Sequence, residues 1–307
     1  MSASRVLFLG VGNMGAALAK TLQPTLNQPI LLWNRTKDRP AIQSLTQQGA
    51  IFHQDVFLAA KQAEIIVICV LDYGTLHSIL EPLNDRTVFS GKTIINLTNG
   101  TLKDATDAER WMKSYGASHY LDGAVMVTPQ LVGTPQSLIL YSGESQETFD
   151  TNVAKLVEPL GLAIYTGPDV GSAAANDLAA LSTMYGMFAG FFTGIGLLKK
   201  QAANSGASGK IKTRVDSVIV PVLAALVPYL SLLAQTVDDQ SYDENAGSPV
   251  GMQLVGIRNI LKACEEEGVD ASGLEALRSL VQRVVDSRGP DGSVAEVVRF
   301  TRGAKTI

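Results

Sequence analysis

The chain has 307 residues, more than one ordinary domain, and 46% of them are hydrophobic, which is enough apolar material for two cores. The formal net charge is −4 and the longest basic run is Lys199-Lys200, so nucleic acid and acidic membrane surfaces are disfavoured as partners. Two cysteines and three scattered histidines predict no disulfide framework and no metal site. A small-molecule partner is expected instead.

The first element is a strand that leads into a glycine-rich turn and then a helix. The strand-forming run Val6 to Leu9 precedes a G-x-G-x-x-G sequence, and an Ala/Leu-rich stretch follows it. In that context the spacing predicts a dinucleotide-binding site, whose phosphates would face the positive N-terminus of the helix. The alternative, a glycine-rich turn without a ligand, is disfavoured because strand, spacing and helix agree. The candidate cofactor-binding residues of this turn are Gly10, Val11, Gly12, Asn13, Met14 and Gly15.

The end of the second strand indicates which dinucleotide binds. An NAD site usually ends this strand with Asp or Glu, which binds the ribose 2′-hydroxyl. Here the strand ends in Asn34-Arg35-Thr36, and Arg39 follows closely. These side chains suit a 2′-phosphate, so NADPH (NADP+) is the expected cofactor. Val70, Leu71 and Thr98, which follow the ends of later strands, complete the candidate cofactor-binding set.

The same N-terminal segment has features of a signal peptide, namely Arg5, an apolar stretch and the sequence Ala17-Leu-Ala-Lys20. Asn13 and three glycines interrupt the apolar stretch, and the next strand continues the nucleotide-binding pattern. We therefore interpret the segment as the first βα unit and expect a cytoplasmic protein.

Strands and helices alternate over the first half of the chain, which predicts an α/β fold with a Rossmann, doubly wound, mainly parallel sheet covered on both faces. The expected strands are Val6–Leu9, Ile30–Trp33, Ile65–Val70, Thr93–Leu97, His119–Val125, Ser137–Tyr141 and Ala163–Tyr165, with helices such as Pro40–Gln48 and Leu102–Tyr115 between them. After about residue 167 the chain is helical to its end. We expect an NADPH-binding Rossmann domain over 1–166, an interdomain helix over 167–200 and a helical substrate and dimerisation domain over 201–307.

The segment Leu178 to Leu198 has no charged residue over 21 positions and carries glycines at every fourth position from Gly186 to Gly194. Its length and composition fit either a membrane-spanning helix or a buried helix of a soluble protein. Asp177 and Tyr185 favour the buried helix. A helix that is apolar all round needs cover on every side, so the sequence predicts an intertwined homodimer in which a partner copy wraps this helix.

Further helices follow the long one. We expect a loop over Ala203–Gly209, an apolar helical stretch over Asp216–Val237, an acidic connection over Asp238–Ser248, a helix over Pro249–Glu267 ended by Gly268, a helix over Leu274–Ser287, a break at Gly289–Gly292 and a last amphipathic helix over Val294–Phe300.

Three places carry polar side chains where dehydrogenase chemistry is expected, at carboxyl ends of strands or under a second domain. Asn99 lies where a strand turns into a helix, and a helix-capping role fits it equally well. Asp177 and Tyr185 lie eight residues apart on the long helix, about 80° around its axis and ~12 Å along it, and internal hydrogen bonding is an equally good explanation. Gln253 is the only polar side chain in its helical turn, for which a core amide is the default.

A linked set of segments along nearly the whole chain matches one known family. These segments are Gly10–Gly15, Trp33–Thr36, Asn96–Thr101, Met126–Pro129, Leu140–Ser145, Gly171–Asp177, Met184–Gly186 and Gly251–Gln253. In them the chain resembles the imine reductases, and within these the fungal NADPH-dependent reductive aminases, which are relatives of the β-hydroxyacid dehydrogenases with a 6-phosphogluconate dehydrogenase-like fold. The β-hydroxyacid dehydrogenases carry a catalytic lysine where this chain has Asp177, and no lysine lies between Leu156 and Leu198.

The resemblance implies hydride transfer from NADPH to an imine or iminium formed from a ketone or aldehyde and a small amine. It also implies that Asp177 and Tyr185 are the catalytic pair, that Asn99 helps to activate the carbonyl group, and that Met126, Val222 and Gln253 line the substrate pocket. Val222 stands where well-known members carry a tryptophan, so a wider pocket is expected. Two alternatives are a β-hydroxyacid dehydrogenase-like oxidoreductase of ketones or hydroxyacids and a catalytically silent NADPH-binding sensor.

Overall fold

The computed structural model describes residues 4–82, 85, 87–205, 210–242 and 248–301. The chain forms two compact units, Met1–Leu181 and Ser182–Ile307. The division lies inside the long helix α8, which runs over Ser172–Ser205.

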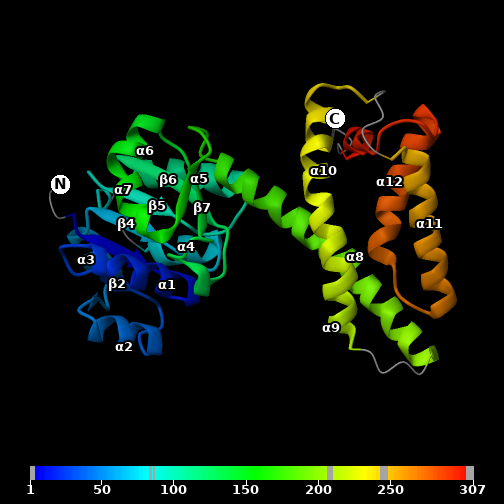
Figure 1. Ribbon diagram of the computed structural model, residues 1–307. Helices are drawn as coiled ribbons and strands as arrows, with labels where there is room; N and C mark the ends of the chain where they lie inside the picture. The colour runs from blue at the N-terminus through cyan, green and yellow to red at the C-terminus, as the bar shows by residue number, and fades with distance from the viewer. Residues whose placement is uncertain (1–3, 83–84, 86, 206–209, 243–247, 302–307) are drawn as a thin grey trace. The chain divides into compact units, whose positions relative to one another are not determined.

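The first unit is built on one eight-stranded sheet with the strand order β3-β2-β1-β4-β5-β6-β7-β8 (Figure 1). Neighbouring strands pair in parallel except β6 and β7, which are antiparallel. The strands are β1 (Val6–Leu9), β2 (Leu31–Trp33), β3 (Ile51–Phe52), β4 (Ile65–Ile68), β5 (Thr93–Asn96), β6 (His119–Val125), β7 (Leu138–Ser142) and β8 (Leu162–Tyr165). The predicted Rossmann sheet is thus confirmed.

Two features of the sheet differ from the sequence-based expectation. The two-residue strand β3 was not predicted, because Ile51 and Phe52 are too short a run to show a period. The direction of β7 was not predicted either. An apolar run shows that a strand exists but not which way it runs, and the connection over residues 126–137 returns the chain without a long crossover helix.

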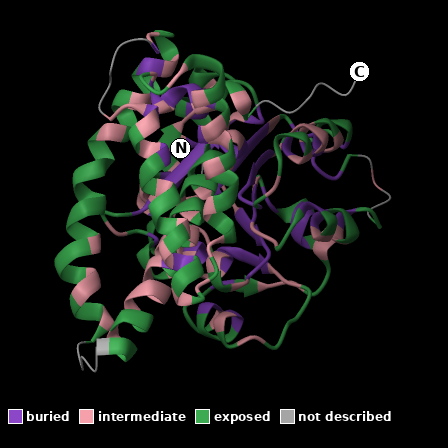
Figure 2. Ribbon diagram, turned by 90° about the vertical axis from the view of Figure 1, so that its right-hand side faces the viewer, coloured by how far each residue is buried: buried purple, intermediate pink, exposed green. Residues whose placement is uncertain are grey.

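Helices cover both faces of this sheet, and each face has its own core. On one face α1, α2, α6 and α7 pack through residues such as Leu18, Leu45 and Phe149. On the other face α3, α4 and α5 pack through residues such as Leu76 and Met112. Figure 2 shows the buried residues gathered on the strands between these layers. The helices are α1 (Asn13–Leu22), α2 (Pro40–Gln47), α3 (Val56–Gln62), α4 (Tyr73–Leu80), α5 (Leu102–Ser114), α6 (Gln146–Asn152) and α7 (Ala154–Val157), with short 3₁₀ turns η1 (Gln23–Thr25), η2 (Pro129–Leu131) and η3 (Glu158–Leu160).

The second unit is helical. Its elements are the remainder of α8, α9 (Ile211–Arg214), a π-helical turn η4 (Val215–Ile219), α10 (Val220–Asp238), α11 (Val250–Glu267), α12 (Ser272–Arg288) and a 3₁₀ segment η5 (Val294–Phe300). A small core joins α11 and α12 through Val250, Leu254, Val281 and Val284. Gly268 has a left-handed backbone with φ of 64°, and so ends α11 as the sequence predicts.

The predicted loop over Ala203–Gly209 is partly wrong. Helix α8 continues through Ala203 and Asn204 to Ser205, because its last part, residues 197–205, contains no glycine or proline. Residues 206–209 and 243–247 of the two predicted connections lie outside the described residues.

The long helices are largely exposed within the single chain. Large apolar side chains such as Phe192 on α8 and Val227 on α10 are more than 60% exposed. Two segments, Ser172–Asn204 and Ile211–Asp238, are long and apolar enough to cross a membrane, a property that they share with core helices of soluble proteins. The cover that the sequence predicts for these helices is therefore not supplied within either unit.

Candidate active site

The glycine turn lies between β1 and α1. Gly10 has a φ of +98°, and a Cβ atom there would lie 2.3 Å from the carbonyl oxygen of Cys69. A Cβ atom on Gly15 would lie 2.1 Å from the carbonyl oxygen of Gly10, so α1 packs directly on the turn. Among the described residues, a Cβ atom on Gly12 would meet nothing within 4 Å, and no side chain caps the start of α1. The turn therefore presents open space and a helix N-terminus, which is the arrangement that binds a pyrophosphate.

A cavity of about 320 Å³ opens at this turn, along the carboxyl ends of β1, β2 and β4. It is lined by most of the predicted cofactor-binding residues: Gly10, Gly12, Asn13, Met14, Gly15, Asn34, Arg35, Thr36, Arg39, Val70 and Leu71. Val11 and Thr98 are not among the lining residues, but each is hydrogen-bonded to a residue that lines the cavity. The Val11 amide donates to Asn34 Oδ1 at 2.9 Å, and the Val70 amide donates to Thr98 Oγ1 at 3.3 Å.

Four lining residues were not predicted: Trp33, Cys69, Thr75 and Ile79. Trp33 ends β2 and Cys69 directly follows β4, so the rule that ligands bind at the carboxyl ends of strands would have found both. Thr75 and Ile79 lie on α4, and their approach to the cavity depends on how that helix packs.

Asn34 connects the glycine turn to the segment that follows β2. Its Oδ1 accepts the Val11 amide of the glycine turn, and its Nδ2 donates to the Thr36 carbonyl oxygen at 2.7 Å. The side chain of Asn34 is thus engaged on both sides. The exposed Arg35 and the half-buried Arg39 are the cations that line the cavity. Guanidinium groups bind phosphate through several hydrogen bonds at once, so the cavity suits a 2′-phosphate.

Two of the three predicted catalytic residues meet in the first unit. Asn99, in the loop between β5 and α5, donates from Nδ2 to Asp177 Oδ2 at 2.5 Å. Asp177 lies in the second turn of α8 and is 6% exposed. Burial raises the pKa of its carboxyl group, and the hydrogen bond from Asn99 opposes that rise. A carboxyl group with a raised pKa exchanges a proton nearer to neutral pH than an ordinary aspartate does.

The remaining predicted residues are placed unit by unit. Met126 packs in the first unit against Ala173, which precedes Asp177 by one turn of α8. Tyr185, Val222 and Gln253 belong to the second unit: Tyr185 on α8 is 61% exposed, Val222 on α10 is exposed, and Gln253 on α11 is half-buried. The side chain of Tyr185 is therefore not buried in a core of the second unit. Its ring packs edge-on against that of Phe188, with 6.1 Å between the ring centroids.

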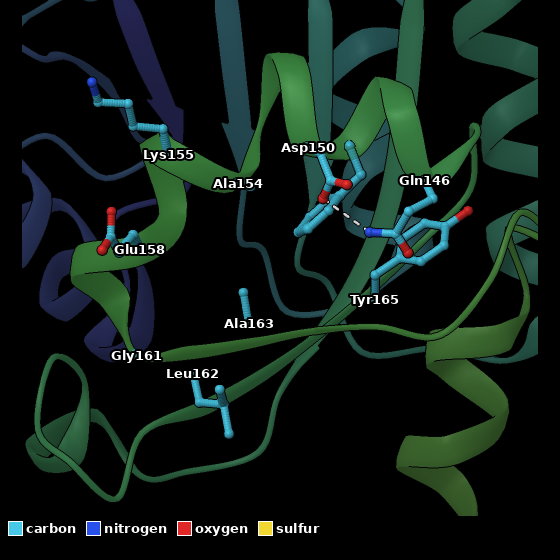
Figure 3. A pocket seen from close by; sticks show the side chains of 10 residues that line it. Gln146, Asp150, Ala154, Lys155, Glu158, Gly161, Leu162, Ala163 and Tyr165 are labelled. Atoms are coloured by element: carbon cyan, nitrogen blue, oxygen red, sulfur yellow. Dashed lines mark hydrogen bonds between the residues drawn. The ribbon is translucent and has the colours of Figure 1, made fainter.

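A second hollow, of about 710 Å³, lies beside α6, α7 and the edge strand β8 (Figure 3). Gln146 and Asp150 face each other across one turn of α6, with Nε2 donating to Oδ1 at 2.9 Å. Lys155 and Glu158 stand farther along its rim. The hollow shares no lining residue with the cavity at the glycine turn, so it is not part of the dinucleotide site.

Comparison with known protein families divides the chain in two. Residues 5–167 match the NAD binding domain of 6-phosphogluconate dehydrogenase. Residues 169–303 match the C-terminal domain of the NADPH-dependent reductive aminase-like proteins.

Similar proteins cover nearly the whole chain. An NADPH-dependent reductive aminase of Aspergillus oryzae is 33% identical over 97% of each chain. A structure of the reductive aminase from Aspergillus terreus with NADPH4, cyclohexanone and allyl amine matches with a TM-score of 0.86 and 32% identity, covering 98% of this chain and all of that one. An imine reductase from Myxococcus stipitatus in complex with NADP+ matches with a TM-score of 0.86 and 27% identity, over 97% of this chain and all of that one.

A Rossmann sheet with a dinucleotide cavity, followed by a helical C-terminal region, defines the class of the protein as a dinucleotide-dependent oxidoreductase. Within that class the comparisons are more specific. The chain belongs to the family of NADPH-dependent reductive aminases and imine reductases, which act on C=N bonds.

Proposed function

We propose that the chain transfers hydride from NADPH to an imine or iminium formed from a ketone or aldehyde and a small amine. The observation that carries the proposal is the contact between Asn99 and the buried Asp177. An acid held by an amide donor suits a reaction in which positive charge develops on nitrogen, because an imine accepts hydride readily only as its cation.

The residues of the cavity fit NADPH. The open face of Gly12 and the uncapped start of α1 suit the pyrophosphate, while Arg35, Thr36 and Arg39 suit the 2′-phosphate. When bound, NADPH supplies the hydride from its nicotinamide ring.

Each polar side chain then has one task. Asp177 accepts a proton from the incoming ammonium, so that a neutral amine attacks, and returns that proton to the hydroxyl that leaves as water. As a carboxylate again, it stabilises the iminium. Asn99 holds the carbonyl oxygen, and the phenol of Tyr185 orients or protonates the nitrogen. Met126, Val222 and Gln253 shape the substrate pocket, and Val222 leaves more room than a tryptophan would.

We further propose how the chain divides this work. Residues 1–166 form the NADPH-binding domain, 167–200 the interdomain helix and 201–307 the helical domain for substrate and dimerisation. We also propose a cytoplasmic location and an intertwined homodimer. The exposed apolar side chains of α8 and α10 support the homodimer, because a partner copy of the same helices would supply apolar cover.

One panel of reactions tests the proposal. NADPH oxidation is measured with a cyclic imine, with a ketone alone and with the ketone plus a small amine. Consumption with the imine and with the ketone–amine pair, but not with the ketone alone, is the expected result. Consumption with the ketone alone at an equal rate would support a ketone or hydroxyacid oxidoreductase. NADPH binding without turnover of any imine would support a silent sensor.

A further inference from the structure

A buried polar cluster lies in the first unit, and none of its residues lines the cavity at the glycine turn. Asp122, in the middle of β6, is 1% exposed and accepts two phenolic hydroxyl groups at Oδ1. Tyr73, the first residue of α4, donates at 2.5 Å, and Tyr120 on β6 donates at 3.3 Å. Asn96, the last residue of β5, donates from Nδ2 to the Tyr120 hydroxyl at 2.9 Å. We call Tyr73, Asn96, Tyr120 and Asp122 the Asp122 cluster.

Such a cluster is expensive to bury. A carboxyl group taken from water destabilises the fold unless hydrogen bonds replace its hydration. Burial raises the pKa of Asp122 to about 7, the charge of Asp104 on α5 acts in the same direction, and the two phenols oppose the rise. Burial also raises the pKa of Tyr73 and Tyr120, so both remain protonated donors. An apolar residue at position 122 would not carry this desolvation cost. The presence of Asp122 therefore suggests that the cluster has a function.

The cluster holds the loop that carries Asn99, and it does so on both sides. Before Asn99, the Thr98 amide donates to Asn96 Oδ1 at 3.2 Å. After Asn99, the backbone of Gly100 lies against the Tyr73 ring so closely that a Cβ atom at Gly100 would be 2.4 Å from a ring carbon. The residues on either side of Asn99 are thus held by Asn96 and Tyr73. Tyr73 donates directly to Asp122, and Asn96 is linked to Asp122 through the Tyr120 hydroxyl.

We propose that the Asp122 cluster positions Asn99 for its contact with Asp177, so that Tyr73, Tyr120 and Asp122 are positioning residues of the reaction. The inference rests on the proposed catalytic role of Asn99. Asp122 acts as a hydrogen-bond acceptor here, and no proton leaves it during the reaction.

The first test removes single hydroxyl or carboxyl groups. Tyr73→Phe keeps the ring against Gly100 and removes only its hydrogen bond to Asp122. Because a small misplacement of a catalytic group has a large effect on rate, kcat for imine reduction should fall about 10-fold or more, with KM for NADPH within about twofold. Tyr141→Phe is the matched control, since the Tyr141 hydroxyl on β7 is buried without a hydrogen-bond partner among the described residues. Equal kcat for the two variants overturns the proposal.

The second test separates hydrogen bonding from proton transfer. Asp122→Asn keeps an oxygen that accepts both phenols, so it should retain most of kcat, while Asp122→Leu should lose it. An asparagine variant as slow as the leucine variant would contradict a positioning role.

The third test asks whether the cluster acts through Asn99. In a double-mutant cycle, Tyr73→Phe should lower kcat in the wild-type background and have little further effect in Asn99→Ala. If the two losses multiply, the cluster does not act through Asn99, although the role of Asn99 stands. If Asn99→Ala alone leaves amine formation unchanged, the catalytic role of Asn99 is wrong and this inference is overturned with it.

Discussion

Asp177 is the residue on which the proposed chemistry depends most. Asp177→Ala should lower kcat for amine formation by about 100-fold or more, because the reaction loses both its anion and its proton acceptor. The dissociation constant of NADPH should stay unchanged, since the glycine turn holds the cofactor independently. Asp150→Ala, which removes an exposed carboxylate on α6, is the control. Equal turnover of the Asp177 variant and the wild type would refute the role.

Arg35 and Asn34 are neighbours with different predicted effects. Arg35→Ala should raise KM for NADPH by about 10- to 100-fold, the value of a charge-assisted hydrogen bond, and leave KM for NADH nearly unchanged. Asn34→Ala should raise KM for both cofactors, because its amide connects the glycine turn to Thr36. Steady-state kinetics with each cofactor give the answer. A loss confined to NADPH in the Asn34 variant would mean that Asn34 acts on the 2′-phosphate itself.

Asp122 gives the stability of the fold a pH dependence of known sign. Burial raises its pKa from 3.8 to about 7. Between these values the folded chain keeps a proton that the unfolded chain has lost, so the group favours folding at low pH and this contribution is lost as the pH rises through about 7. Relative to Asp122→Asn, the wild type should lose on the order of 4 kcal/mol of unfolding free energy from about pH 4 to about pH 8. Parallel urea-unfolding curves for the two proteins across this range would contradict the assignment.

In the turn between β1 and α1, substitutions of two glycines should have different effects, one on cofactor binding and the other on stability. Gly12 has a backbone that any residue adopts, with a φ of −75°, and open space at its Cβ position. Gly12→Ala should therefore melt like the wild type and bind NADPH about tenfold or more weakly, a loss of about 1.4 kcal/mol. Gly15→Ala meets the carbonyl oxygen of Gly10 and should destabilise the unit by about 1–3 kcal/mol. Thermal melting and cofactor titration measure both effects, and unchanged NADPH binding by Gly12→Ala would contradict the placement of the pyrophosphate.

The same elements show what a sequence can predict. All seven predicted strands begin and end within two residues of the observed ones, because apolar runs between polar helices have a clear period. The direction of β7 and the existence of β3 left no such trace. The Asp122 cluster also escaped prediction. Its only signal was an acidic residue inside an apolar strand, and its partners come from β5 and α4, which only the folded sheet brings together.

The candidate site divides in the same way. The cofactor-binding residues are local to strand ends, so most of them could be predicted from spacing alone. Asn99 and Asp177 are 78 positions apart. The residues themselves left a helix cap and an internally bonded acid as alternatives, and the family resemblance implied a catalytic role for each without predicting their contact. Their contact follows from the fold, which places the β5–α5 loop against the first turns of α8.

For the whole molecule, the exposed apolar faces of α8 and α10 predict a stable dimer. Light scattering at micromolar concentration, without detergent, should give twice the 32.6 kDa of one chain. Val227→Glu places a charge on α10 at a position that is 61% exposed and should weaken the dimer. Leu58→Glu on α3, at an apolar position of the first unit that is 51% exposed, should leave the dimer unchanged. A wild-type mass of one chain would contradict the dimer, and a need for detergent would favour a membrane location.

The proposed reaction delivers hydride from NADPH to the carbon of a C=N bond. An isotope label on the transferred hydrogen gives the most direct test. NADPH that carries deuterium at both hydrogen positions of C4 of the nicotinamide ring is incubated with the protein and a cyclic imine, and the product amine is analysed by NMR. We expect deuterium on the carbon that was doubly bonded to nitrogen, and we expect Asp177→Ala to form this labelled amine more slowly than the wild type. Product amine without deuterium at that carbon, or no amine from any imine while NADPH still binds, would contradict the proposed reaction.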